Sequence, residues 1–340
     1  MLFYILLILS VLLLELCNYQ IKTKKDLFFG MCLLLIIIFS GLRNNIGWDY
    51  KAYYDTIAFG ADTNIYSKRE WLNYNLINFT RRMLFPHFYF IFTSSVSTIL
   101  IGETIKKYSD DKWMSIYLYL TFPLFFLNSM SVIRNFVAIS IVVYSTKYII
   151  DKKLVRFVIA VILAAGFHQS AYIALLLYPL SRLKLNKKIY LLILVIIPLM
   201  KNLLLVGMYK ILPYYYIYLR ETSNREGRFA IIVILLIFVT ILLLDKKMIY
   251  NNLHNKFFNF YFFGCLIYIM YYKFGTLGHR LSLYGSIYMI FIVPYFINNL
   301  SNKTKILAKM VLWTVFFLFY LYTIIRGSET YIPYTTVLQW

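Results

Sequence analysis

A few ionisable residues stand at the ends of long apolar segments of this sequence. Arg43 and Asp49 follow an apolar segment in GLRNNIGWDYKAYY. Arg134 begins a second apolar segment in NSMSVIRNF. His168 stands in AAGFHQSAY, and Arg280 stands in GTLGHRLSLY. Ionisable groups at such positions usually face a polar cavity or a charged partner, because burying them in hydrocarbon is costly. For a single arginine, snorkelling of the head group to water is an equal alternative, but three together favour a shared site.

These residue types suit phosphate binding and proton transfer. Arginine donates paired hydrogen bonds from a planar guanidinium and stays charged when partly desolvated, so Arg43, Arg134 and Arg280 are candidate phosphate ligands. His168 is a candidate general base, because imidazole exchanges protons near neutral pH. Asp49 and Glu70 compete with it for that role.

Each of these residues also has a structural interpretation. His168 lies in a Gly-containing turn between two short apolar segments, where it is at least as well explained as a hinge that satisfies spare backbone groups. Asp49 is as well explained by an ion pair with Arg43 that shapes the loop. Gly47 is expected to permit the turn that folds this loop back towards the helices.

The elements that position these residues are membrane-spanning helices. The chain has 340 residues, of which 61% are hydrophobic and only 14% charged, a balance far from that of a soluble domain. A hydrocarbon core takes about 20 helical residues to cross, and hydropathy predicts an all-α polytopic membrane protein with about twelve spans in a single transmembrane domain, 1–340. The expected spans are 2–19, 27–42, 86–103, 113–129, 134–150, 154–167, 169–181, 189–206, 229–244, 257–273, 279–297 and 306–325.

The positive charges predict the orientation of these spans. The net charge is +21, but lysine and arginine are spread over short loops, so no nucleic-acid partner is predicted. Assigning alternate loops to one side gives that side at least three positive charges in every loop, which makes it cytoplasmic. Both termini and two larger loops, about 43–85 and 207–228, are then extracytoplasmic. The second loop contains Arg220, Arg225 and Arg228.

Several of these segments resemble the EpsG-like and Wzy-type bacterial polysaccharide polymerases. GLRNNIGWDYKAYY is similar to the family's arginine, glycine, aspartate and tyrosine motif after the second span, with the matching positions at Arg43, Gly47, Asp49, Tyr50 and Tyr53. SKREWLNYNL resembles a glutamate-led helix that begins at Glu70, although Trp71 replaces the expected proline.

Three later segments extend this resemblance. SVIRNFVAIS is similar to the family's arginine-led fifth span, with Asn135 in place of the usual glutamine after Arg134. GFHQSAYIALLLYPL resembles a histidine–serine turn with Gln169 between the two, and HRLSLYGSIYMIFIVPY adds the late Arg280. The matches cover the chain from about 40 to 295, and their order and spacing are more specific than any one motif.

The resemblance implies an inverting glycosyltransferase that joins undecaprenyl-pyrophosphate-linked oligosaccharide repeat units outside the bacterial cytoplasmic membrane. It implies Tyr50, Tyr53 and Gln169 as substrate-binding residues beside Arg43, Arg134 and Arg280, a chain-length regulator as a partner, and a fold compatible with GT-C-like architecture. Arg220, Arg225 and Arg228 are further candidate substrate ligands in the second outer loop. No cofactor is expected. No metal is expected either, because the predicted outer face has no paired carboxylates resembling a DxD motif; Asp110 and Asp111 fall in a cytoplasmic loop.

Two other function classes share parts of this pattern. A lipid-linked oligosaccharide flippase would also have many spans and a cationic cavity, but alternating access favours charges at the membrane midplane and an internal repeat, whereas here the unusual charges gather at one predicted face. A membrane acyltransferase usually meets its donor on the cytoplasmic side, where the loops offer little beyond basic charge.

Overall fold

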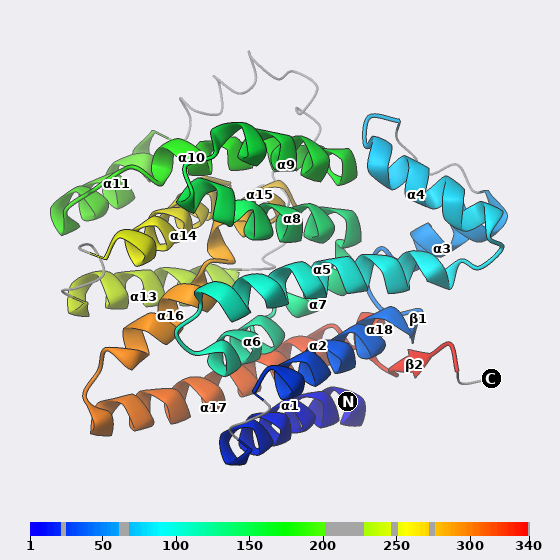
Figure 1. Cartoon of the computed structure of the whole chain (residues 1–340), viewed down its shortest axis with the longest axis horizontal. Helices are drawn as coiled ribbons and strands as arrows, with labels where there is room; N and C mark the ends of the chain where they lie inside the picture. The colour runs from blue at the N-terminus through cyan, green and yellow to red at the C-terminus, as the bar shows by residue number, and fades with distance from the viewer. Residues whose placement is uncertain (22–24, 61–67, 201–227, 246–250, 272–275, 339–340) are drawn as a thin grey trace. The chain divides into compact units, whose positions relative to one another are not determined.

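A computed structural model of the chain describes residues 1–21, 25–60, 68–200, 228–245, 251–271 and 276–338 (Figure 1). Most of these residues are helical, and a short antiparallel pair of strands, β1 (Arg43–Asn44) and β2 (Thr335–Thr336), joins the loop after the second helix to the C-terminal segment. By their internal contacts the residues form two compact units, one of Met1–Tyr172 with Leu300–Trp340 and one of Ile173–Asn299.

The first unit contains the long helices and the loop helices that follow GLRNNIGWDYKAYY. Its helices are α1 (Leu2–Gln20), α2 (Lys25–Gly41), α3 (Tyr50–Phe59), α4 (Trp71–Arg82), α5 (His87–Tyr108), α6 (Lys112–Thr121), α7 (Phe126–Ser131), α8 (Ile133–Ile150), α9 (Leu154–Phe167), α17 (Asn302–Arg326) and α18 (Ser328–Tyr331). Helix α2 packs between α1 and α5, and α8 packs between α5 and α9. The 3₁₀ helix η2 (Gln169–Leu176) begins in this unit and continues into the second.

The second unit is organised around a long aromatic helix. It contains α10 (Leu177–Leu180), α11 (Lys187–Leu199), α13 (Arg228–Leu244), α14 (Asn252–Tyr271), α15 (Thr276–Ser286) and α16 (Met289–Asn298). Helix α14 contacts α11, α13, α15 and α16. It approaches α15 closely at two glycines, since a Cβ added to Gly285 would lie 2.4 Å from the backbone N of Gly264.

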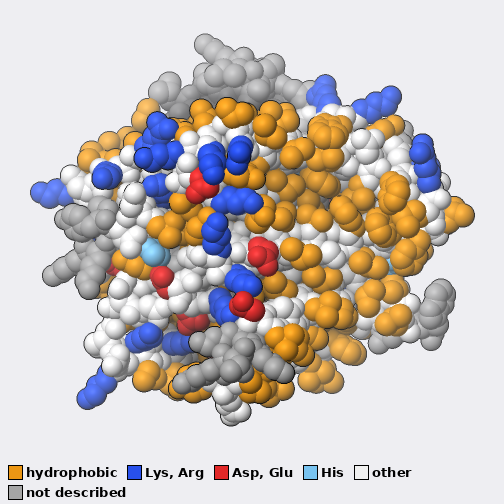
Figure 2. Space-filling view, in the orientation of Figure 1, with side chains coloured by type: hydrophobic (Ala, Val, Ile, Leu, Met, Phe, Trp, Pro, Cys, Tyr) orange, Lys and Arg blue, Asp and Glu red, His pale blue; other side chains and the backbone are white. Residues whose placement is uncertain are grey.

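The helices confirm a multi-pass membrane protein. Among the residues that the structure describes, four helices, α1, α5, α8 and α17, are long and apolar enough to cross a membrane. The bent pair α15–α16 gives a fifth if its 41° break is counted within one span. Large apolar side chains are exposed along two of these helices, for example Leu13 on α1 and Leu318 on α17. Apolar side chains also cover much of the face seen in Figure 2, as expected of surfaces that face lipid.

The twelve-span segmentation is not established by these helices. Several expected spans coincide with shorter or interrupted elements, and the sequence gives the reason. The expected span 113–129 divides into α6 and α7, because Pro123 disfavours helix at Phe122, and helix α6 ends at Thr121. The expected spans 154–167 and 169–181 are α9 and the η2–α10 pair, separated by an extended His168.

Candidate functional site

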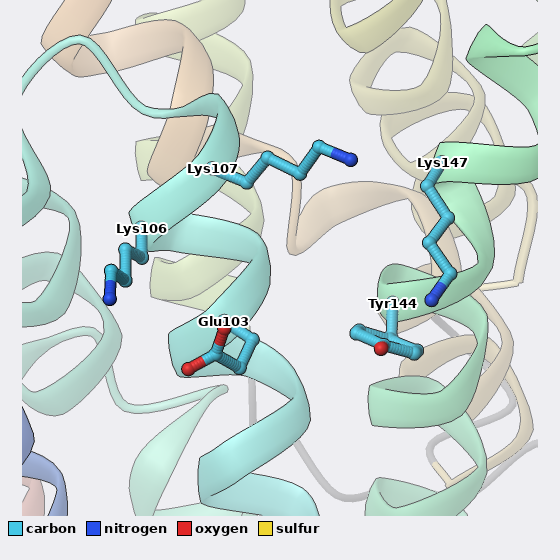
Figure 3. A pocket seen from close by; sticks show the side chains of 5 residues that line it. All are labelled: Glu103, Lys106, Lys107, Tyr144 and Lys147. Atoms are coloured by element: carbon cyan, nitrogen blue, oxygen red, sulfur yellow. The ribbon is translucent and has the colours of Figure 1, made fainter.

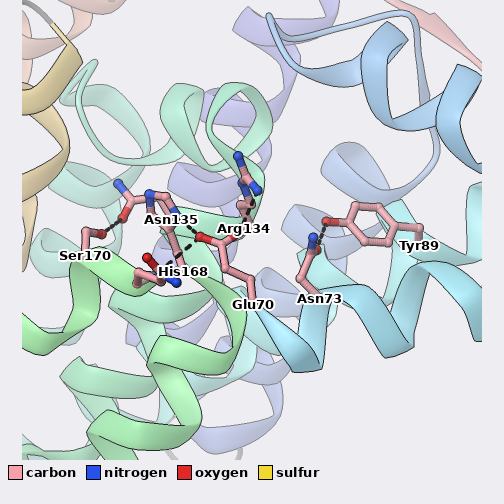
Figure 4. A network of polar contacts seen from close by, with 8 residues as sticks. Glu70, Asn73, Tyr89, Arg134, Asn135, His168 and Ser170 are labelled. Atoms are coloured by element: carbon pink, nitrogen blue, oxygen red, sulfur yellow. Dashed lines mark hydrogen bonds and ion pairs between the residues drawn. The ribbon is translucent and has the colours of Figure 1, made fainter. Parts of the chain in front are cut away.

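Glu70 is the centre of a buried polar cluster in the first unit. It is the residue before α4, yet its side chain does not cap that helix and is only 7% exposed. Its Oε2 accepts a hydrogen bond from Arg134 Nη1 at 2.6 Å, and its Oε1 lies 2.6 Å from His168 Nδ1 (Figure 4). Oε1 also accepts from the backbone N–H of Gln169 at 3.2 Å. One carboxylate thus joins two side chains that the sequence had marked separately.

The local structure explains how these residues meet. Glu70, Asn73 and Ile77 are buried at spacings of three and four residues, so they share the face of α4 that packs against α5 and α9. Arg134 is the second residue of α8, while His168 follows the last residue of α9 in extended conformation. Because the helix breaks at His168, the backbone N–H of Gln169 points towards the carboxylate of Glu70.

The electrostatics of the cluster favour an ionised Glu70. Burial alone would raise the pKa of Glu70, but the hydrogen bond from His168, the charge of Arg134 and the backbone N–H of Gln169 together lower the pKa below its ordinary value of 4.5. An ionised carboxylate only accepts hydrogen bonds. His168 therefore donates through Nδ1, and in the neutral ring the basic lone pair is at Nε2.

Polar residues that the sequence interpretation did not select surround this centre. Tyr89 donates its hydroxyl to Asn73 Oδ1 at 2.7 Å, and Ser170 donates to Asn135 Oδ1 at 3.0 Å (Figure 4). The predicted Tyr53 is fully buried and stacks on Tyr89 with 4.9 Å between ring centroids. Asn73 was detectable in principle, because it lies three residues after Glu70 on one helical face.

Asp49 approaches the same group from the loop after α2. Its negative charge acts on Arg134, Tyr53 and Tyr89, and its backbone N–H donates to the carbonyl of Ser131 at 3.3 Å. The loop motif and the arginine-led helix α8 therefore lie side by side, and their membership in one functional site stays a prediction.

Arg43 is placed differently from the expectation. Its side chain is fully buried, and it does not form the ion pair with Asp49 that was one of the two interpretations of that aspartate. Its guanidinium lies 5.2 Å from the centroid of the Phe90 ring. Its hydrogen bonds go to acceptors of the loop and of neighbouring helices: the carbonyls of Ser40, Ile46 and Met130 and the hydroxyl of Ser94. Arg43 thus holds together the end of α2, the loop, α5 and α7.

Gly47 makes the predicted turn, and the reason is close packing. Its φ is +101°, and a Cβ at this position would lie 2.1 Å from the carbonyl oxygen of Met130. Only glycine adopts this conformation without strain and leaves room for the approach. The turn lets Asp49 reach Ser131, at the end of α7.

The C-terminal segment fastens the same loop. β2 pairs with β1 through the register Arg43 to Thr336 and Asn44 to Thr335. The N–H of Gly47 donates to the carbonyl of Thr330 at 3.3 Å, and the hydroxyls of Tyr331 and Ser131 lie 2.9 Å apart. The sequence motifs gave no signal for this contact, because it joins positions nearly 300 residues apart.

The remaining predicted residues are not brought into the cluster. Tyr50 donates its hydroxyl to Asn44 Oδ1 and lies 3.0 Å from His87 Nε2, so it supports the loop. Arg280 belongs to the second unit, on α15, where its Nε is buried and has no hydrogen-bond partner among the described residues. Arg220 and Arg225 lie outside the described residues, and Arg228 is the first residue of α13.

Comparison with known protein families identifies one family over most of the chain. The model of the EpsG family matches residues 26–336, which include Glu70, Arg134, His168 and the loop with Asp49. No curated protein and no solved structure matches the chain.

Proposed function

The chain belongs to the EpsG family, which is associated with exopolysaccharide synthesis, and on that premise we propose that it is a membrane glycosyltransferase. In this proposal it polymerises undecaprenyl-pyrophosphate-linked oligosaccharide repeat units on the extracytoplasmic face of the bacterial cytoplasmic membrane. The observation that carries the proposal is the junction of His168 and Arg134 on one buried carboxylate, Glu70. It supplies a base and a cation, the two groups that transfer from a pyrophosphate donor needs.

The reaction joins a sugar hydroxyl to an anomeric carbon. The acceptor hydroxyl gives its proton to His168 Nε2 as its oxygen attacks the donor's anomeric carbon from the face opposite the leaving group. The bond between that carbon and the pyrophosphate oxygen breaks, and its electron pair leaves with undecaprenyl pyrophosphate. The anomeric configuration inverts. Arg134 faces the charge that grows on the leaving group, where a fixed cation stabilises the transition state most.

Glu70 orients the base in this mechanism and is not itself the base. Its lowered pKa makes it a weak proton acceptor at neutral pH, and both its oxygens already accept hydrogen bonds. A carboxylate in this position fixes the imidazole tautomer and stabilises the imidazolium that forms. Asp49 adds a second negative charge near Arg134, so we assign it to positioning that arginine.

The other arginines take separate roles. Arg43 is fully buried and supports the loop that carries Asp49. Arg280 is our second candidate for a pyrophosphate ligand, because its buried guanidinium N–H has no acceptor among the residues that the structure describes, and such a group favours an anionic ligand. The predicted outer face has no paired carboxylates for a metal ion, so we propose that arginine and not a metal handles the leaving-group charge.

The test uses purified protein with synthetic lipid-linked repeat units and a chelator in one arm. We expect chains of several units from the parent protein with and without the chelator, and single units only from His168→Ala and Arg134→Ala. Arg326→Ala, an exposed arginine on α17, is the matched control and should polymerise normally. Normal chain growth by both site variants would overturn the assignment.

A cellular experiment separates this proposal from a flippase. A strain without the gene should carry surface glycan capped with single repeat units. Absence of lipid-linked units from the outer leaflet in that strain would instead indicate transport.

A further inference from the structure

A second polar site lies at the opposite end of α5 from the cluster around Glu70. A cavity of about 340 Å³ is lined by Glu103, Lys106, Lys107, Tyr144 and Lys147, which come from the last turns of α5 and α8 (Figure 3). This volume lies at the lower end of the range of roughly 300–1,000 Å³ typical of small-ligand sites. The catalytic proposal uses none of these side chains.

Two of the lysines have ammonium groups available to an anion. Within the described part of the chain, Lys107 and Lys147 take part in no ion pair, and their ammonium groups lie 5.2 Å from the Tyr108 ring and 3.5 Å from the Tyr144 ring. Lys106 is different, because it pairs with Asp26 at 3.2 Å. Figure 3 shows Lys107 reaching from α5 towards α8 while Lys106 points away.

The chemistry of the lining matches a phosphodiester headgroup. Lys107 and Lys147 outnumber Glu103, so the lining keeps an excess of positive charge even though Lys106 is paired with Asp26. The ends of both helices lie at the side predicted to be cytoplasmic, where anionic lipids gather. The carboxylate of Glu103 offers an acceptor for headgroup hydroxyls, and Tyr144 has the ring type common at membrane interfaces. We propose that this pocket binds the phosphoglycerol headgroup of an anionic membrane phospholipid.

The test measures lipid retention by the full-length protein. Native mass spectrometry of protein purified in equal amounts of phosphatidylglycerol and phosphatidylcholine should show preferential retention of phosphatidylglycerol. Each lysine near a membrane surface strengthens the binding of anionic lipid about fivefold, so the double variant Lys107→Gln, Lys147→Gln should retain phosphatidylglycerol about thirtyfold less. Gel filtration establishes that the variant is folded, and the single variant Lys147→Gln should show a smaller loss.

A matched control removes the same charge elsewhere. Lys303→Gln with Lys305→Gln changes the first turn of α17, on the same predicted side and outside the pocket, and should retain lipid like the parent. Equal loss in both double variants, or none in the pocket variant, would overturn the proposal. Millimolar inorganic phosphate should not release the lipid; release would identify free phosphate, and not a phospholipid, as the ligand.

Discussion

Glu70 and His168 are 98 positions apart in the chain, yet Glu70 Oε1 and His168 Nδ1 lie 2.6 Å apart in a site from which water is largely excluded. The contact favours the proposed base over the hinge as the interpretation of the histidine. A hinge residue would satisfy backbone groups of its own turn, whereas this imidazole donates to a carboxylate that also binds Arg134. The pairing resembles in its chemistry the carboxylate–histidine pairs that activate hydroxyl nucleophiles.

The first prediction concerns the charge of Glu70. In Glu70→Gln the side chain keeps its size, but its amide can donate to His168 Nδ1 and then favours the tautomer with the proton at Nε2. Because the base is lost while the shape remains, we expect transfer to fall by about 10²–10⁴-fold, the usual contribution of general base catalysis. The measurement is the initial rate of chain elongation by purified protein.

Asp151→Asn is the control for that experiment. It removes an exposed carboxylate that follows α8 and pairs with the exposed Lys153, and it should leave the rate unchanged. A rate for Glu70→Gln within about threefold of the parent would contradict a base that depends on this carboxylate.

The second prediction concerns acid stability. Because the pKa of Glu70 is lower in the folded protein than its ordinary value of 4.5, the ionised carboxylate stabilises the fold above that pH. This stabilisation is lost as the pH falls through the folded-state pKa. The thermal midpoint of detergent-solubilised parent protein should therefore drop more between pH 7 and pH 4 than that of Glu70→Gln. An equal drop in both proteins would show that other groups dominate.

The sequence marked the residues of this cluster more readily than the contacts between them. Arg134 and His168 stood out because charge at the end of an apolar segment is rare, and Glu70 because of its resemblance to a glutamate-led helix. Their meeting on one carboxylate was not predictable, since it depends on how α4 packs against α9. Asn73 and Tyr89 escaped notice because single polar residues are common in loop helices and at membrane interfaces.

Arg43 and the span count show what sequence patterns leave open. An arginine at a helix end indicates a phosphate ligand or snorkelling, but packing of α7 and α5 around the loop gives Arg43 a set of carbonyl acceptors that no local pattern contains. A hydropathy profile locates apolar segments, but it does not show where a helix within such a segment is interrupted. Breaks such as that at Phe122 and Pro123 therefore leave several expected spans short.

The third prediction applies one substitution to two arginines. In Arg43→Lys a single ammonium group replaces the planar guanidinium and cannot reach the same set of carbonyl acceptors. Leaving some of them unsatisfied in a buried site should destabilise the protein by about 2 kcal/mol or more. In Arg134→Lys the positive charge beside Glu70 remains, so the protein should stay folded while losing bidentate phosphate binding and most of its transfer activity. Thermal midpoints and elongation rates measured on both variants distinguish these outcomes. A stable but inactive Arg43→Lys would instead indicate direct substrate contact.

The fourth prediction concerns the turn that carries Asp49 and compares two glycines of the first unit. In Gly47→Ala the new methyl group would meet the carbonyl of Met130, and φ of +101° is strained for alanine. We expect the free energy of unfolding to fall by at least about 2 kcal/mol. Chain elongation should also weaken, because the loop that carries Asp49 moves.

Gly30→Ala is the control. Gly30 lies within α2, with no atom within 4 Å of the added Cβ, and the substitution should stabilise the helix by about 0.5–1 kcal/mol. Denaturation in mild detergent measures both changes, and a Gly47→Ala protein as stable as the parent would show that the loop does not need this turn.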